Sequence, residues 1–129
     1  MHKGERPAVV DLDLLEARLL GAALAGRAET YGSLLAFFER RVTPVTVAAL
    51  CKDLGRVCTR IEALGGPDLA CLVVRASDGL PGAGYFTSLR EAGLYVGEPT
   101  GPEAERYIAQ AQRRAGAWAR RLQREARRG

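Results

Sequence analysis

Histidine is almost missing from this chain of 129 residues: the only one, His2, lies beside the N-terminus. We expect it to belong to a frayed end and not to a site. A chain without internal histidine has no imidazole base for nucleophilic catalysis. Cysteine is also scarce, and Cys51, Cys58 and Cys71 are odd in number and surrounded by apolar residues. They are typical of buried thiols, and we expect no metal, no cofactor and no disulfide framework.

Long hydrophobic runs are absent as well, since none approaches the roughly 18 residues that a membrane-spanning helix needs. Hydrophobic residues make up 47% of the chain and charged residues 26%. These values are ordinary for a globular protein, and the length suits one domain. We therefore expect a soluble, cytoplasmic protein with one core.

What the sequence does have is an uneven distribution of charge. The net charge is +4, and from Pro102 onward eight arginines stand against three glutamates. The rest of the chain is close to neutral. A basic segment of this kind is typical of proteins that contact nucleic-acid phosphates.

Start and stop signals predict four helices. Asp11 or Asp13 can cap a first helix that Gly26 ends, and Thr30 can cap a short second helix. The third begins with Thr43 followed by Pro44 and stops at Gly65 and Gly66. Its spacing predicts a buried stripe of Val47, Cys51, Leu54, Cys58 and Ile61. Pro102 suits the first turn of the last helix.

The stretch "LACLVVRASDGLPGAGYFT", residues 69–87, predicts a β-hairpin with a glycine-rich turn, and a further short strand is expected at Leu94 to Val96. Three helices followed by a hairpin are the order of a winged helix-turn-helix. The expected fold class is therefore α+β, a mainly helical, winged helix-turn-helix-like domain with one β-hairpin and a long basic C-terminal helix. The expected divisions are a flexible lead at 1–8, the domain at 9–100, and at 101–129 a basic helix that packs on it or extends from it.

In that architecture the exposed face of the third helix would enter the major groove. Thr46 and Lys52 are candidates for base contacts, Arg56 and Arg60 for phosphate contacts, and Arg75 would stand beside the wing. Further phosphate contacts are expected from the arginines of the last helix: Arg113, Arg114, Arg120, Arg121, Arg124, Arg127 and Arg128. The alternative for any such set is an ordinary solvated helix face.

Three short motifs carry a resemblance to a known family. "TYG" opens the second helix, a proline begins the third, and "VVRASDG" is followed by "GAGYF". Residues Thr30 to Phe86 thereby resemble the DNA-binding half of the alkylguanine-DNA alkyltransferases and alkyltransferase-like proteins. The resemblance implies a helix-turn-helix that binds DNA, with Tyr31 as a phosphate or nucleotide contact.

The family's active-site motif is missing here. Its Pro-Cys-His-Arg-Val-Val run corresponds to "LACLVV", in which Cys71 is nearby but the histidine and arginine are absent. The arginine that the family inserts into the base stack should fall near Val47 or Ala48, and neither can take that part. A cysteine without a base or a cationic neighbour stays a thiol, so alkyl transfer is not expected.

Two other functions compete with DNA binding. An enzyme would need a site, but the turn "DGLPGAG" lacks the Lys-Ser/Thr of a P-loop, and no residues assemble a nuclease or hydrolase site. The alanine-lined stripe of the last helix could instead pair with a second copy or a partner protein, without nucleic acid. Its apolar face is too weak for membrane insertion. The leading hypothesis is a non-catalytic nucleic-acid-binding protein, for DNA more than RNA, in transcription regulation or an architectural role.

Overall fold

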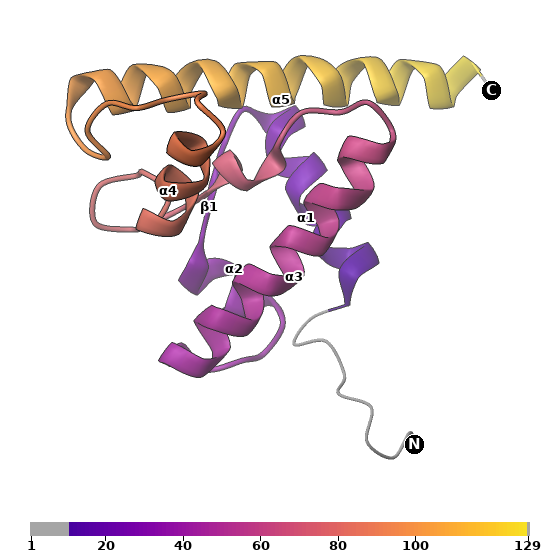
Figure 1. Ribbon diagram of the computed structural model, residues 1–129. Helices are drawn as coiled ribbons and strands as arrows, with labels where there is room; N and C mark the ends of the chain where they lie inside the picture. The colour runs from indigo at the N-terminus through magenta and orange to yellow at the C-terminus, as the bar shows by residue number, and fades with distance from the viewer. Residues whose placement is uncertain (1–10, 129) are drawn as a thin grey trace.

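The computed structural model describes residues 11–128, which form a mainly helical α+β fold (Figure 1). The expected lead at 1–8 lies outside the described residues. The described elements, in chain order, are α1 (Leu12–Ala25), β1 (Glu29–Thr30), α2 (Tyr31–Phe37), α3 (Pro44–Ala63), the 3-10 helix η1 (Leu69–Leu72), β2 (Val73–Val74), α4 (Ala83–Glu91) and α5 (Pro102–Arg128).

The capping signals read from the sequence are confirmed. The Asp11 side chain accepts hydrogen bonds from the backbone N–H groups of Asp13 and Leu14, and Gly26 ends α1 with a φ of 70°. Thr30 and Thr43 each form a capping box with the residue three positions later, Ser33 and Thr46. These bonds satisfy backbone donors that the first turn of a helix leaves free.

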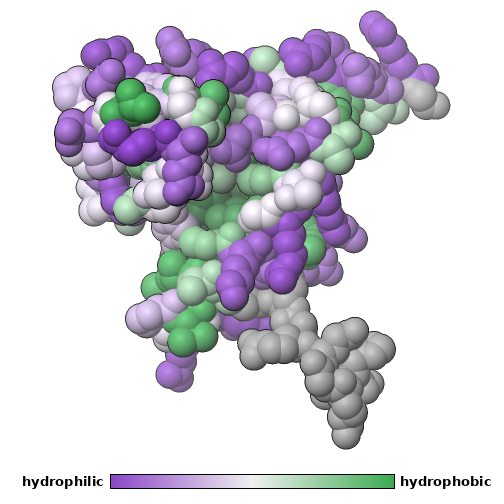
Figure 2. Space-filling view, in the orientation of Figure 1, coloured by the Kyte–Doolittle hydropathy of each residue, from purple (hydrophilic) through white to green (hydrophobic). Residues whose placement is uncertain are grey.

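The long helix α5 runs along one side of the domain and continues past it (Figure 1). It packs on α1 and η1, and Ala104, Ile108, Ala115, Gly116 and Ala119 are its buried residues. A Cβ at Gly116 would lie 3.0 Å from the carbonyl oxygen of Ala23, so the absence of a side chain there lets the two helices approach closely. Figure 2 shows hydrophilic residues along the outer side of this helix.

Trp118 joins α5 to the end of α3. A Cβ at Gly66 would lie 2.7 Å from its ring and 2.5 Å from Ile61 Cγ2. The indole therefore rests directly on the backbone just after α3, where only glycine leaves enough room.

The predicted β-hairpin is wrong. β2 pairs in parallel with β1, with Glu29 opposite Val73 and Thr30 opposite Val74. Residues 83–91, expected to include the second strand, form α4. Leu94 to Val96, expected to be a strand, is not one either. Within residues 11–128 there is consequently no wing.

Local chemistry explains the difference. The Asp68 side chain accepts a hydrogen bond from Ala70 N–H, which starts a turn of 3-10 helix at the point where a strand was expected. Phe86 and Leu89 are buried on one side of α4, at helical and not strand spacing. The alternation expected for a strand is therefore missing after Pro81.

Two apolar clusters form the core. The larger joins α1, α2, α3, η1 and part of α5, and the smaller consists of Leu80, Phe86, Leu89, Tyr95, Ala104 and Ile108. On α3 the buried apolar residues are Leu50, Leu54, Val57 and Ile61, so the predicted stripe is displaced by part of a turn. Cys51 is exposed, and Val47 and Cys58 are half-buried. The larger aliphatic side chains occupy the side that faces α1 and α2.

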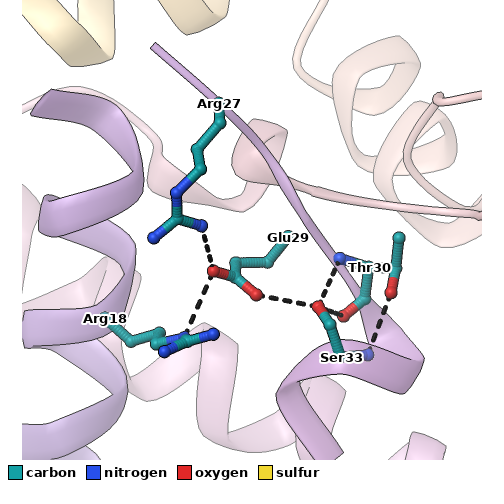
Figure 3. Close-up of polar contacts among 5 residues, drawn as sticks. All are labelled: Arg18, Arg27, Glu29, Thr30 and Ser33. Carbon is teal, nitrogen blue, oxygen red and sulfur yellow. Dashed lines mark hydrogen bonds and ion pairs between the residues drawn. The ribbon is translucent and has the colours of Figure 1, made fainter. Parts of the chain in front are cut away.

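A buried carboxylate holds β1 between α1 and α2 (Figure 3). Glu29 is only 3% exposed, and its Oε2 lies 3.2 Å from Arg18 Nε and forms a second ion pair with Arg27. The Ser33 hydroxyl donates to Glu29 Oε1 at 2.7 Å and also accepts from Thr30 N–H. Burial raises the pKa of Glu29, but hydrogen bonds from Arg27 and Ser33 and the two guanidinium charges lower it by more.

We expect Glu29→Gln to lower the free energy of unfolding by about 1–3 kcal/mol, because it removes charge-assisted hydrogen bonds at a buried position. The native pKa of Glu29 lies below that of the unfolded chain. Its contribution is therefore complete above about pH 5 and is lost as the pH falls through the native value. Urea unfolding between pH 7 and pH 3 should show a weaker acid destabilisation in the variant. Parallel pH profiles would contradict this role.

Candidate nucleic-acid interface

A mainly apolar cavity of about 520 Å³ lies beside α3. α3 and α4 form its two sides, while η1, the start of α2 and the loop after α4 complete it. Figure 2 shows hydrophobic surface at the hollow between α3 and α4. The residues that line it are Tyr31, Cys51, Leu54, Gly55, Cys58, Asp68, Ala70, Gly82, Gly84, Tyr85, Ser88, Leu89, Ala92 and Leu94.

Two tyrosines contribute aromatic rings to this cavity. The Tyr31 hydroxyl accepts a hydrogen bond from Gly82 N–H at 3.2 Å, which connects the start of α2 to the start of α4. Burial raises the pKa of Tyr31 and of Tyr85, so both phenols are neutral at physiological pH. Tyr31, expected to contact a phosphate or a nucleotide, is thus a cavity residue.

The cavity contains no activated thiol. Cys71 is completely buried, whereas its neighbour Ala70 lines the cavity. Cys58 Sγ donates to Asp68 Oδ1 at 3.3 Å. Burial and the nearby Asp68 charge raise the pKa of Cys58 and of Cys71 to about 12. Both remain thiols near neutral pH and are poor nucleophiles.

Alkylation should separate the three cysteines. Iodoacetamide at pH 8 should modify the exposed Cys51 first, although burial also raises its pKa. Cys58 and Cys71 should react only after denaturation. Peptide mass spectrometry over time measures the order. Rapid modification of Cys71 in the native protein would contradict the absence of a reactive thiol.

The exposed side of α3 borders the same cavity. Val45, Ala48, Lys52 and Thr59 are exposed along it, together with Cys51 and Gly55 at the rim. Most of these side chains are small, so another surface can approach the helix backbone closely.

The four residues of α3 predicted to contact DNA differ in their surroundings. Thr46 belongs to the capping box with Thr43, Arg56 forms an ion pair with buried Asp53, and Arg60 lies 2.8 Å from Asp13 and 3.4 Å from Glu16. Lys52 is exposed and forms no ion pair with any carboxylate in residues 11–128.

Arg75 also has a partner in the fold. Its Nη2 lies 2.8 Å from Asp78 Oδ2, its Nε donates to Asp78 Oδ1, and that same oxygen accepts from Leu80 N–H. The Arg75 hydrogen bond lowers the pKa of Asp78. Asp78 therefore stabilises the turn before α4. This role explains why an acidic residue is present in a segment that was expected to approach phosphate.

The arginines of α5 are less constrained. All seven that were expected to contact phosphate are exposed, and none forms an ion pair with a carboxylate of the described chain. They are Arg113, Arg114, Arg120, Arg121, Arg124, Arg127 and Arg128.

Sequence reasoning missed the part of the cavity that α4 supplies. Gly84, Tyr85 and Ser88 were assigned to a hairpin or its flank, although Tyr85, Phe86 and Leu89 repeat at helical spacing. Gly82, the N-cap residue of α4, was the available helix-start signal, because glycine is accepted at N-caps.

No group of histidine, cysteine, aspartate or glutamate side chains within residues 11–128 could hold a metal ion. Over the same range, no helix has the length and apolar character needed to cross a membrane. Comparison of the chain with known proteins found no matching family model, curated protein or solved structure.

Proposed function

We propose that this protein binds duplex DNA without catalysing a reaction, with the exposed side of α3 in the major groove. The observation that carries the proposal is the position of a large apolar cavity directly beside that side of α3. α2 and α3 are joined by residues 38–43 and contact each other, an arrangement compatible with a helix-turn-helix. In a winged helix-turn-helix, a β-hairpin follows the third helix. In this chain α4 occupies the place of that hairpin.

The cavity would receive one base displaced from the helical stack. Proteins that recognise a displaced base hold it in a pocket between aromatic and apolar side chains, and they favour mismatched or damaged bases because these cost less to unstack. The neutral phenols of Tyr31 and Tyr85, the Leu54 side chain and the carboxylate of Asp68 supply such surroundings. The resemblance to alkyltransferase-like proteins makes an alkylated guanine the first base to test.

The chemistry of the cavity supports binding without reaction. Ala70 lines it where the resemblance would require the nucleophilic cysteine, and the pKa values of Cys58 and Cys71 are raised to about 12. A base held there would meet neutral thiols and no internal imidazole. Recognition followed by recruitment of other proteins, or regulation of transcription, is the function that such a site would serve.

The exposed arginines near the end of α5 would add affinity without sequence preference. Each arginine that contacts a phosphate releases counterions, so its contribution falls as salt rises. Arg124, Arg127 and Arg128 are exposed and follow Ala119, the last buried residue of α5. They can therefore be changed without disturbing the core.

Changing Arg124, Arg127 and Arg128 together to Gln should weaken binding to a random duplex at low salt. The slope of log K against log salt should decrease by about 0.9 for each phosphate that the variant no longer neutralises. Fluorescence anisotropy at several salt concentrations measures both effects. The matched control replaces the same residues with Lys, which keeps the charge and should keep the slope. If wild type does not bind at low salt, the DNA proposal fails and the assembly-module alternative gains support.

Filling the cavity should selectively remove recognition of a displaced base. Gly84 lies on α4, and a Cβ there meets no atom within 4 Å. Gly84→Leu should therefore fold while occupying part of the cavity, and Gly84→Ala is the control with little added volume. We expect wild type and Gly84→Ala to prefer a duplex with one alkylguanine or one mismatch over a matched duplex. In Gly84→Leu that preference should fall at least tenfold, while affinity for the matched duplex stays the same. Equal preference in Gly84→Leu and Gly84→Ala would contradict the role of the cavity.

A further inference from the structure

A second cleft, of about 330 Å³, lies where the end of α1, the 3-10 helix η1 and the middle of α5 meet. It shares no lining residue with the cavity beside α3. Its apolar lining is made of small residues and Leu72, whereas Arg27, Arg113 and Arg120 supply positive charge.

The arrangement on α5 directs positive charge into this cleft. Arg113, Gly116 and Arg120 are spaced by three and four residues, so they lie on one face of the helix. Gly116, between the two arginines, packs against the Ala23 carbonyl oxygen, which lies 3.0 Å from the position that a Cβ would occupy. Arg120 Nη1 lies 3.3 Å from the position that a Gly116 Cβ would occupy, so this side chain folds back over the glycine toward Arg113.

The polar groups around the cleft favour an anion. Arg113 and Arg120 form no ion pair with a carboxylate in residues 11–128. Arg27 pairs with Glu29, but that carboxylate is buried and shared with Arg18 and Ser33. Gln112 Nε2 donates to the Cys71 carbonyl oxygen at 2.9 Å, which fixes the amide at the cleft wall.

We propose that this cleft binds a phosphate group through Arg113, Arg120 and Arg27. Guanidinium groups donate paired hydrogen bonds that match the geometry of phosphate oxygens. A phosphate would also relieve the repulsion between arginines that face one cleft. The phosphate can come from a small phosphate ester or from a nucleic-acid backbone. The proposal does not rest on DNA binding at α3.

Inorganic phosphate is the probe for the first experiment. Titration of the ¹⁵N-labelled protein, with chloride at matched ionic strength as the reference, should shift the Gly116 amide and the Gln112 side-chain signals in a saturable way. Arg113→Gln combined with Arg120→Gln should weaken phosphate binding at least tenfold. The control, Arg41→Gln combined with Arg106→Gln, removes the same charge at exposed positions that line neither the cleft nor the cavity, and it should leave phosphate affinity unchanged.

Absence of saturable shifts would overturn the proposal, and so would an equal loss of affinity in the two double variants. A second arm identifies the source of the phosphate by adding a saturating duplex. If the duplex displaces phosphate from the cleft, the site holds a backbone phosphate; if phosphate still binds, the site takes a small ester. Either result supports the cleft as a site. The titration with inorganic phosphate contains no DNA. A negative result in it would therefore count against the phosphate site and not against DNA binding by α3.

Discussion

The buried carboxylate of Glu29 is the interaction on which the arrangement of the other elements depends. It anchors β1 to the middle of α1 through Arg18 and to the segment after α1 through Arg27, and through Ser33 to the first turn of α2. β1 in turn pairs with β2, and β2 directly follows the 3-10 helix whose Ala70 lines the cavity. One ion-pair network thus determines where two distant segments of the chain meet.

The two concave surfaces differ in the chemistry that they offer. The one beside α3 is mainly apolar, with neutral phenols and thiols, and suits a planar, uncharged group. The other carries arginines above small residues and suits an anion. The η1 segment separates them, because Ala70 lines the first and Leu72 the second. A shift of η1 would change both surfaces at once.

Local signals in the sequence predicted the boundaries of α1, α2, α3 and α5 well, but they missed α4 and the pairing of the sheet. Caps at Asp11, Thr30 and Thr43 involve residues close in the chain, so short motifs are enough to find them. The parallel pairing of Glu29 with Val73 joins residues far apart, and the sequence near Val73 equally suits a hairpin. The cavity could not be predicted because it needs residues 83–91 to form a helix on the side opposite α3. The exposure of the α5 arginines could be predicted from the sequence, because most residues of that helix are polar.

The contact of Trp118 with Gly66 gives the protein a built-in optical reporter. The chain has one tryptophan, and it lies on the backbone that follows α3. Its fluorescence therefore reports whether the long basic helix is seated on the domain or has moved away from it. Any ligand that loosens or tightens this seat will change the emission without an added label.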